Sequence, residues 1–326
     1  MPRALVTGVS GQDGFYIAEL LIGLGYEVHG ATRGNAPKRL SEIRDRHAGR
    51  VAVHSYSQED PTCWRTLIER IEPHEVYHLA ADSFVPNGWD DPIANSVTNY
   101  HPVLELLEAI RDISPRTKLL NACSREVFGN AATLAANETT PMRPTTMYGI
   151  HKAASRWAVE TYRERYGLLV CSAILFNHES PRRPENFVTR KITKAAAEIS
   201  RGLRDSLELG NTSAQRDWSY AGDIVDAMHR MMQLEQPEDF VLGSGTPASI
   251  SQFAEHAFKA VSLDWRNFVK ESTKLHRGNE SGVITADSSK AITYLKWRAT
   301  TCIGELARAM VEHDLSLLDH QHRDAV

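Results

Sequence analysis

The chain contains 326 residues, of which 42% are hydrophobic and 24% are charged, and its formal net charge at pH 7 is −4. A chain of this length and composition can bury a sizeable core as one large domain or two modest ones. The slight net acidity argues against a surface for nucleic acid or a membrane. Local arginines and backbone amides would have to hold any anionic ligand.

The histidines and cysteines show no metal-ligand spacing, so we expect no metal site. Cys63, Cys123, Cys171 and Cys302 are widely scattered, which predicts buried free thiols in a reducing cytoplasm. No apolar run reaches the length of a signal peptide or a membrane span. The sequence therefore predicts a cytoplasmic globular protein.

The N-terminal segment has the pattern of a nucleotide-binding turn. An apolar run at residues 4–7 predicts a strand, and a glycine-rich stretch and a helical period follow it. Glycines three apart at this place allow a tight turn and let the backbone approach a pyrophosphate at the positive end of the helix. An ordinary glycine-rich turn is the alternative. The predicted cofactor contacts are Gly8, Ser10, Gly11, Gln12, Asp13 and Gly14.

A second strand is predicted at residues 27–31, and Arg33 lies just beyond its end. A carboxylate at this place would bind the ribose hydroxyls of NAD, whereas an arginine suits a 2′-phosphate. The sequence thus favours NADP over NAD. The alternative is a surface arginine in a basic loop with Lys38 and Arg39.

Strands and helices alternate through the rest of the first half. We predict strands at 51–54, 75–80, 118–122 and 168–176, and helices at 62–71, 99–113 and from about 148 to 166. This alternation is typical of an α/β protein with a Rossmann-type, doubly wound parallel sheet. Ala80 and Ala81 end the fourth strand, and such small residues let a cofactor lie against the backbone. Residues 1–176 are therefore predicted to form an NADP-binding domain.

Two separate segments carry a candidate catalytic set. Ser124 and Glu126 follow a predicted strand, and Tyr148 and Lys152 lie four residues apart, on one face of a helix. A lysine ammonium near a phenol favours the phenolate, so Tyr148 could act as a base near neutral pH. Ser124 would orient a substrate oxygen. Because hydride transfer needs no further carboxylate, Glu126 implies a second proton to move. Taken singly, each residue could lie on a solvated helix face or strand end.

The second half differs in character. A polar loop covers 177–183, a cation-rich helix starts near 187, and Arg216 follows a short strand at 207–210. Basic residues beside loops predict a site for a second anion, such as a sugar-nucleotide diphosphate, although a solvated face is the alternative. Further helices are predicted at 223–234, 251–261 and 303–313, with a strand at 240–242 and a frayed tail. We expect a smaller, mixed α/β substrate domain over 177–326, from which the chain re-enters the first domain around 211–245.

These motifs together resemble the extended short-chain dehydrogenase/reductase superfamily and, more narrowly, the GDP-mannose 4,6-dehydratase family. The resemblance covers roughly residues 3–315, and the run around His178 is its most specific part. It is carried by residues 7–14, 175–183, 187–193, 216–218 and 236–241.

The resemblance implies an internal redox reaction with loss of water. In this family the tyrosine removes the proton of the sugar 4-hydroxyl as hydride passes from C4 to NADP. The glutamate takes the C5 proton and assists loss of the C6 hydroxyl as water, and hydride then returns to C6. The product is a 4-keto-6-deoxy sugar. Ser124 stands where the family usually has threonine.

The resemblance also implies binding residues and an assembly. Cofactor contacts are expected at Arg33, Ser57, Leu79, Ala80, Ala81, Ser83, Tyr148, Lys152, His178 and Arg183. Sugar-nucleotide contacts are expected at Ser83, Ser124, Asn177, Val188, Lys191, Arg216, Arg277 and Glu280. A homodimer or a homotetramer is the implied assembly, and GDP-mannose or a related GDP-sugar is the implied substrate.

The chain departs from the family pattern mainly at cofactor and subunit contacts. Gly34 and Asn35 stand in place of a motif with paired arginines and serines. Ser57 and Ala94 replace an aspartate and a tyrosine on the cofactor side, and Arg125 interrupts a stretch of small residues. The sugar could therefore differ from mannose, for example a heptose on GDP. The sequence is also compatible with a nucleotide-sugar epimerase or reductase and, from a different class, with a non-catalytic NADP-binding protein.

Overall fold

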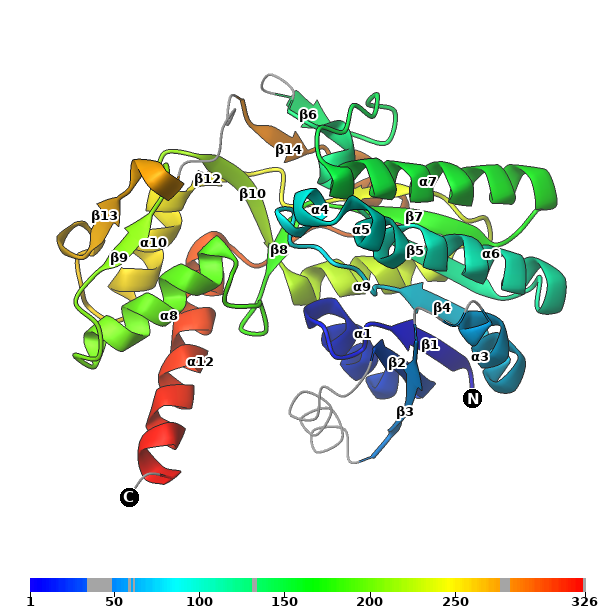
Figure 1. Cartoon of the computed structure of the whole chain (residues 1–326), viewed down its shortest axis with the longest axis horizontal. Helices are drawn as coiled ribbons and strands as arrows, with labels where there is room; N and C mark the ends of the chain where they lie inside the picture. Colours follow the sequence, from blue (N-terminus) through cyan, green and yellow to red (C-terminus); the bar gives the residue numbers. More distant parts are fainter. Residues whose placement is uncertain (34–48, 58–59, 61, 131–133, 276–281, 325–326) are drawn as a thin grey trace.

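A seven-stranded sheet dominates the computed structural model, which describes residues 1–33, 49–57, 60, 62–130, 134–275 and 282–324 (Figure 1). The strand order is β11-β7-β5-β4-β1-β2-β3, and every neighbouring pair is parallel. The chain moves outward from β1 in both directions, as in a Rossmann sheet. The predicted doubly wound α/β fold is confirmed. The strands are β1 (Arg3–Thr7), β2 (Glu27–Arg33), β3 (Val51–Tyr56), β4 (Glu75–His78), β5 (Lys118–Ser124), β7 (Val170–Leu175) and β11 (Phe240–Leu242).

Helices cover both faces of this sheet. In β1, Ala4 and Val6 are buried in one apolar cluster with residues of α1 and α9, whereas Leu5 is buried in another with residues of α3, α6 and α7. Because successive side chains of a strand point to opposite faces, this alternation gives the parallel sheet two buried faces. The covering helices are α1 (Gln12–Gly23), α3 (Cys63–Ile71), α6 (His101–Ile113), α7 (Met147–Tyr166), α9 (Ala221–Met232) and α11 (Ser289–Tyr294).

A second core lies beside the large sheet (Figure 1). It is built from apolar residues of three helices, including Phe253 and Met310, which pack with Trp218 of a small three-stranded sheet. Its helices are α8 (Val188–Ser200), α10 (Ile250–Lys259) and α12 (Ile303–Asp324), and its strands are β8 (Asn177–Glu179), β9 (Leu207–Leu209), β10 (Gln215–Tyr220), β12 (Pro247–Ser249) and β13 (Val269–Glu271). The remaining elements are α4 (Asn87–Asp90), α5 (Pro92–Asn99), the turns η1 (Arg125–Phe128), η2 (Trp265–Asn267) and η3 (Thr273–Leu275), and the pair β6 (Leu134–Ala136) and β14 (Ile284–Ala286).

The helix predicted at 99–113 is divided in the structure. Helix α5 ends at Asn99, Tyr100 leaves helical geometry with φ −123° and ψ −51°, and α6 begins at His101. Pro102 falls in the first turn of α6, where its missing N–H costs no hydrogen bond. The predicted single helix is therefore wrong at its start, and α5 was not predicted.

Two predictions for the C-terminal part are also wrong. The last helix does not end at His313 but continues to Asp324. Asp314 is buried there and accepts hydrogen bonds from Arg190 Nε at 2.9 Å and Thr193 Oγ1 at 2.8 Å, which ties α12 to α8. All four cysteines are free, but Cys302 is exposed whereas the other three are buried as predicted.

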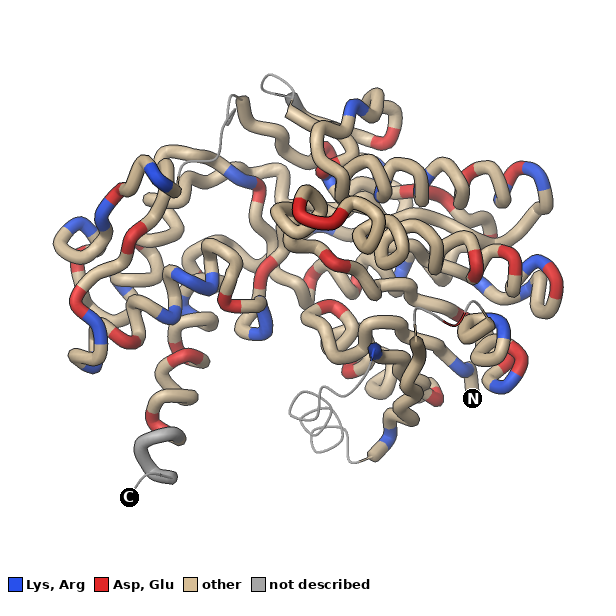
Figure 2. The backbone as a smooth tube through the Cα atoms, in the orientation of Figure 1, with Lys and Arg blue, Asp and Glu red and all other residues tan. Residues whose placement is uncertain are grey.

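Charged residues of both signs are interspersed over the chain (Figure 2). Within the described residues, no helix combines the length and the apolar composition that a membrane span requires.

Candidate functional site

The glycine-rich turn lies against the end of β4. Gly8 has a φ of +69°, and a Cβ on it would lie 2.9 Å from the backbone of Ala80. A Cβ on Gly14 would lie 2.2 Å from the carbonyl oxygen of Gly8. Only glycine fits either position. Gly11 is the N-cap residue of α1, so no side chain at this position accepts a hydrogen bond from the first amides of the helix. This leaves a backbone cradle at a helix N-terminus, which suits the phosphates of a dinucleotide.

Thr7 joins the ends of β1 and β4. Its Oγ1 accepts hydrogen bonds from Leu79 N at 3.1 Å and Ala80 N at 3.0 Å, and lies 3.0 Å from His78 Nδ1. These amides are therefore unavailable to a sheet ladder, which explains why β4 ends at His78 and not at the predicted residue 80. The bonds place Leu79, Ala80 and Ala81 at the carboxyl edge of the sheet, where ligands of such folds bind.

A cavity of about 1120 Å³ opens beside the ends of β2 and β3. Arg33, Tyr56 and Ser57 line one side of it, and residues of α4 and α5, including Ala94, line the other. Because β2 and β3 are the strands beside β1 on this side of the sheet, the cavity lies where the ribose and adenine of a dinucleotide would be expected. Three carboxylates also line it, those of Asp82, Asp90 and Asp91.

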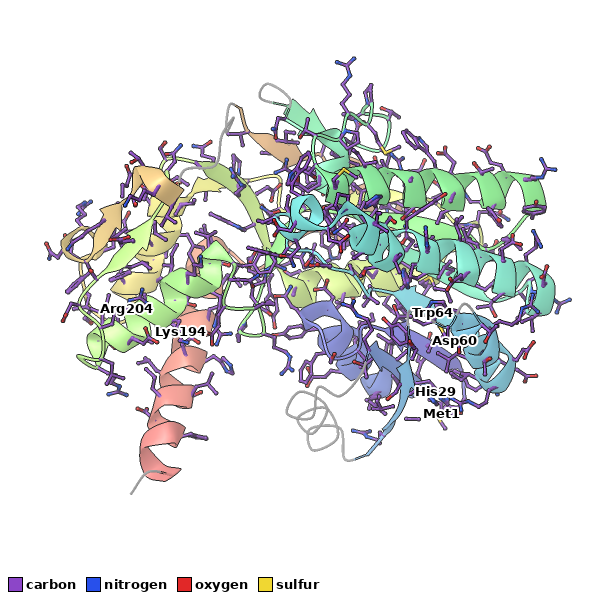
Figure 3. The ribbon with its side chains drawn as sticks, viewed as in Figure 1. Met1, His29, Asp60, Trp64, Lys194 and Arg204 are labelled. Atoms are coloured by element: carbon purple, nitrogen blue, oxygen red, sulfur yellow. The ribbon has the colours of Figure 1, made fainter. Side chains whose placement is uncertain are left out.

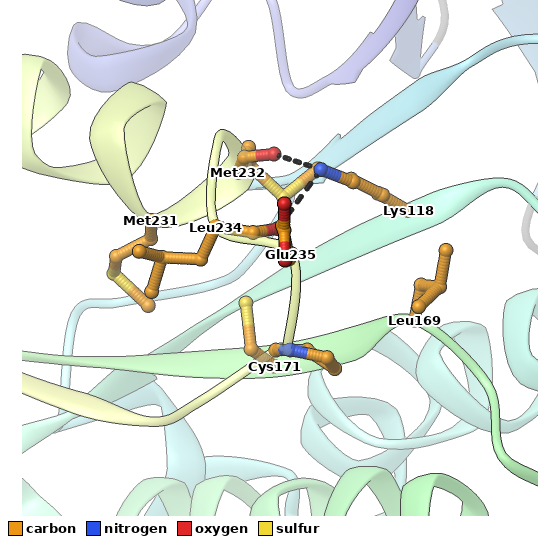
Figure 4. Close-up of a pocket in the computed structure, with 8 residues that line it drawn as sticks. Lys118, Leu169, Cys171, Met231, Met232, Leu234 and Glu235 are labelled. Carbon is orange, nitrogen blue, oxygen red and sulfur yellow. Dashed lines mark hydrogen bonds between the residues drawn. The ribbon is translucent and has the colours of Figure 1, made fainter.

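A second, much smaller cavity of about 10 Å³ lies at the opposite edge of the sheet (Figure 4). Lys118, the first residue of β5, donates there to Met232 O at 2.6 Å and Leu234 O at 3.1 Å. The lysine thus caps the C-terminal end of α9. This cavity has room for about one water molecule and not for a substrate.

The predicted catalytic residues meet where β5 and α7 approach each other. Ser124 ends β5, and its Oγ accepts a hydrogen bond from Glu126 N at 3.2 Å. Thr146 Oγ1 starts α7 by accepting a hydrogen bond from Gly149 N at 3.0 Å. A Cβ on Gly149 would lie 2.6 Å from the carbonyl oxygen of Glu126, so glycine lets the first turn of α7 lie directly against η1.

Tyr148 lies at the centre of this group. It is 7% exposed, hydrogen-bonds to Ser124 and is subject to the charge of Glu126. Lys152 Nζ lies 5.8 Å from the centroid of the Tyr148 ring. The structure therefore brings together Ser124, Glu126, Tyr148 and Lys152.

The electrostatics of the pair differ from the prediction. Burial raises the pKa of Tyr148, although the Ser124 hydrogen bond opposes this. The expected lowering toward neutral pH is wrong for this structure. The main reason is the burial of the phenol itself, and Lys152, which donates to Ala122 O at 2.8 Å, is not among the groups that lower the pKa of Tyr148. Burial also lowers the pKa of Lys152 to about 8.

The loop after Phe176 is bound to the glycine turn. Gln12 Nε2 donates to His178 O at 3.0 Å, and Ser180 Oγ donates to Gln12 Oε1 at 2.8 Å. His178 Nε2 lies 2.9 Å from Asp13 Oδ2. Burial alone would lower the pKa of His178, but the Asp13 carboxylate raises it, and the pKa of Asp13 is lowered by His178 against the effect of its own burial. The two therefore form a largely buried ion pair.

Arg183 follows in the same loop. Its Nε lies 3.1 Å from Glu179 Oε2, and its guanidinium lies 3.6 Å from the centroid of the Phe187 ring. Phe84, which follows Ser83, also contacts Phe187, with ring centroids 5.8 Å apart. Ser83, Arg183 and the start of α8 at Val188 are thereby brought to one region.

The predicted substrate contacts are only partly brought together. Asn177 pairs with Trp218 in the register of β8 and β10, so it lies close to Arg216. Val188 and Lys191 lie on the first turn of α8, and Lys191 is exposed. Arg277 and Glu280 fall outside the described residues.

Two further cations, Lys194 of α8 and Arg204 in the turn that follows it, pair with a carboxylate of the same helix. Lys194 and Arg204, labelled in Figure 3, both pair with Glu198, at 3.9 Å and 3.2 Å. Their side chains are 38% and 39% exposed, so these are solvated surface pairs of small energetic value. For these two residues the alternative of a solvated face holds.

The described residues hold no group of three His, Cys, Asp or Glu side chains that could bind a metal ion.

Comparison with known proteins places this site in a family. Residues 5–310 match the sequence model of the family described as GDP-mannose 4,6 dehydratase. The chain belongs to this family. The Arabidopsis thaliana protein GDP-mannose 4,6 dehydratase 2 is 40% identical over 325 residues, 96% of this chain and 87% of the plant protein. The GDP-mannose 4,6-dehydratase of Sinorhizobium fredii is 38% identical and covers 97% of each chain. The human one is 35% identical and covers 97% of this chain and 92% of its own.

Solved structures share the fold of this GDP-mannose 4,6-dehydratase family member at lower identity. A UDP-glucose 4-epimerase from Thermotoga maritima has a TM-score of 0.85 at 24% identity, over 97% of this chain and 99% of its own. A dTDP-glucose 4,6-dehydratase from Bacillus anthracis has a TM-score of 0.83 at 17% identity, over 96% of both chains. The predicted family, enzyme class and fold are thus confirmed.

Sequence reasoning did not assign two residues that shape the site of this dehydratase family member. Thr7 fastens the glycine turn to β4, and the polar residue that ends the apolar run 4–7 was the available signal. Arg125 lies 3.6 Å from Glu126. The sequence marks Arg125 only as a charged residue within a stretch of small residues, which indicates no particular role.

Proposed function

We propose that the chain converts a GDP-sugar, GDP-mannose in the first place, into the GDP-4-keto-6-deoxy sugar. The observation that carries the proposal is the meeting of Ser124, Glu126 and Tyr148 at the carboxyl edge of the sheet, next to a backbone cradle for a dinucleotide. A base, a hydroxyl and a further carboxylate are what oxidation at C4 and loss of water across C5 and C6 require. Family membership supports the same reaction.

A nicotinamide cofactor fits the residues present. Gly8 and Gly14 let the turn pack against the end of β4 and against its own backbone, which leaves the N-terminus of α1 open to a pyrophosphate, and NADP is the proposed form because Arg33 lines the large cavity. When bound, the cofactor would accept hydride from C4 and return it to C6. Ser10, Gln12, Asp13, Ser57, His178 and Arg183, together with residues 79–81 and Ser83, are the other proposed contacts.

The side chains divide the proton transfers between them. Tyr148 takes the proton of the 4-hydroxyl as a phenolate, which requires that the positive charge of a bound oxidised nicotinamide offset the rise that burial causes in the Tyr148 pKa. Ser124, hydrogen-bonded to the phenol, orients the sugar oxygen. Glu126 takes the proton from C5. The electron pair of that C–H bond forms a C5–C6 double bond while the C6–O bond breaks, and Glu126 passes its proton to the departing hydroxyl, which leaves as water. A proton from solvent then completes C5 as C6 is reduced.

We further propose a division of labour along the chain. Residues 1–176 would hold the cofactor, and 177–326 mainly the GDP part, through Asn177, Val188, Lys191 and Arg216. Residues 211–245 return to the first domain, a proposal supported by the pairing of β11 with β7 and the packing of α9 on α1. Assembly as a homodimer or homotetramer is part of the same proposal.

Incubation of the purified chain with NADP and GDP-mannose, and separately with other nucleotide sugars, tests this function. Mass spectrometry should show a product that has lost one water, while the absorbance of the cofactor shows no net reduction or oxidation. A product of unchanged mass, or net consumption of reduced cofactor, would indicate an epimerase or a reductase and contradict the proposal.

A further inference from the structure

The residue beside Glu126 has an unusual environment. Arg125 Nη1 lies 3.6 Å from Glu126 Oε1, and the two side chains are only 14% and 23% exposed. Arg125 Nη2 donates to Gly129 O at 3.3 Å, at the far end of the same turn. Its Nε is buried and has no hydrogen-bond partner among the described residues. The guanidinium is therefore held across η1, although not all of its N–H groups donate a hydrogen bond.

The surroundings direct the charge of Arg125 to Glu126. Asp217 is the other carboxylate that acts on it, but Asp217 already accepts hydrogen bonds from the amides of Ser244, Gly245 and Ala286 at 2.8–2.9 Å. Arg216 repels the guanidinium. Burial lowers the pKa of Arg125, so the buried cation requires an anionic partner.

The backbone of the turn is fixed independently of this pair. Ser124 Oγ holds Glu126 N, and Gly149 packs against Glu126 O. Neither contact restrains the carboxylate at the end of the Glu126 side chain. Among the described residues, Arg125 is the cation within ion-pair distance of it.

We propose that Arg125 is a positioning residue that holds the Glu126 carboxylate over the site for removal of the C5 proton. This role rests on the proposed function, because it serves the step in which Glu126 acts.

A double-mutant cycle tests whether Arg125 acts through Glu126. R125S should lower kcat with GDP-mannose on the order of 10²-fold, as expected for a misplaced reacting group, and change KM by less than about threefold. R125K should recover part of the loss, and so should added guanidinium with R125S. In the E126Q background, R125S should cause no further loss, because residues that act as one unit are not additive. R143S is the matched control, since Arg143 is exposed and lies beside the same turn.

Two kinetic outcomes would overturn the proposal. Losses from R125S and E126Q that multiply would show that Arg125 acts independently of Glu126. A raised KM with unchanged kcat would show that it contacts the substrate instead.

Crystal structures of the unaltered chain and of R125S provide a readout that needs no turnover. The Glu126 carboxylate should take up a different rotamer in R125S, and an unchanged rotamer would overturn the proposal. If the unaltered chain forms no dehydrated product from any nucleotide sugar, the proposed function fails, and these two structures still decide whether Arg125 holds Glu126.

Discussion

The two halves of α7 meet buried charges of two different kinds. Near its C-terminal end, Asp239 accepts hydrogen bonds from Arg156 Nε at 3.1 Å, Arg163 Nη1 at 2.8 Å and Ser172 N at 2.9 Å. Both carboxylate oxygens are thus used, and α7 is bound to β7 and β11. Near its N-terminal end, α7 carries the buried Lys152 and packs beside Arg125 and Glu126. Here Arg125 Nε is buried and makes no hydrogen bond among the described residues.

This difference separates structural charges from functional ones. A buried charge whose every donor and acceptor is engaged can only hold the fold together. A buried charge with unused hydrogen-bonding capacity costs stability, and such a cost is typical of a site that awaits a ligand. The comparison predicts that substitutions at the N-terminal end change activity and those at the C-terminal end change stability.

The largest effect is expected from E126Q. The amide cannot take the C5 proton, so kcat should fall on the order of 10²- to 10⁴-fold, while binding of GDP-mannose is kept. Steady-state kinetics and calorimetric titration measure the two quantities, and urea unfolding measures the stability that is lost because Arg125 no longer faces a carboxylate. Normal turnover by E126Q would remove the carboxylate from the mechanism.

A large loss of stability is expected from D239A. Removal of this carboxylate leaves Arg156 and Arg163 without their buried partner, which should lower the free energy of unfolding by about 3–5 kcal/mol. Glu238 is the matched control, because its side chain is 44% exposed and pairs with Lys290. E238A should change the free energy of unfolding by less than about 1 kcal/mol. Urea unfolding of both variants makes the comparison. Equal losses would show that the Asp239 cluster does not hold the fold.

The Asp13–His178 pair predicts a pH-dependent effect. The raised pKa of His178 means that its contribution to stability is present below its unfolded value and lost as pH rises through the folded pKa. The lowered pKa of Asp13 means that the contribution of Asp13 to stability is lost only as pH falls through the folded pKa of Asp13. D13N should therefore lower the free energy of unfolding by about 1–3 kcal/mol near pH 6, and by less near pH 9. Urea unfolding at the two pH values measures this, and an equal loss at both would contradict the ion pair.

The smallest effect is expected from R33A. The variant should weaken binding of NADP by about tenfold or less, and that of NAD hardly at all, because three carboxylates line the same cavity and already oppose a phosphate. Calorimetric titration with each cofactor measures this. R3A, at the amino edge of the sheet, should change neither affinity. Equal losses for the two cofactors in R33A would show that Arg33 does not meet the 2′-phosphate.

The parts of the molecule that depend on local sequence were predictable. The apolar run before Gly8, the glycines of the turn and the spacing of Tyr148 and Lys152 each act within a few residues. They led to the sheet, the cradle and the catalytic pair, although strand and helix ends shifted by one or a few residues.

Long-range contacts account for what was missed. Asp314 keeps α12 helical beyond His313 because Arg190 binds it from α8, and no pattern near residue 314 reveals that partner. Likewise, Lys152 donates to the carbonyl of Ala122, which lies 30 positions earlier in the chain. The four-residue spacing of Tyr148 and Lys152 does not reveal this partner, so the sequence predicted an ammonium directed at the phenol. The short strands β6 and β14 exist only as a pair across the chain.

Reaction in deuterated water tests the central claim most directly, because it follows the proton that Glu126 is proposed to move. With GDP-mannose and catalytic NADP, NMR spectroscopy should show a 4-keto-6-deoxy product with deuterium at C5, and the cofactor should show no net change in redox state. A dehydrated product that keeps the original hydrogen at C5, or the absence of any dehydrated product, would contradict the account.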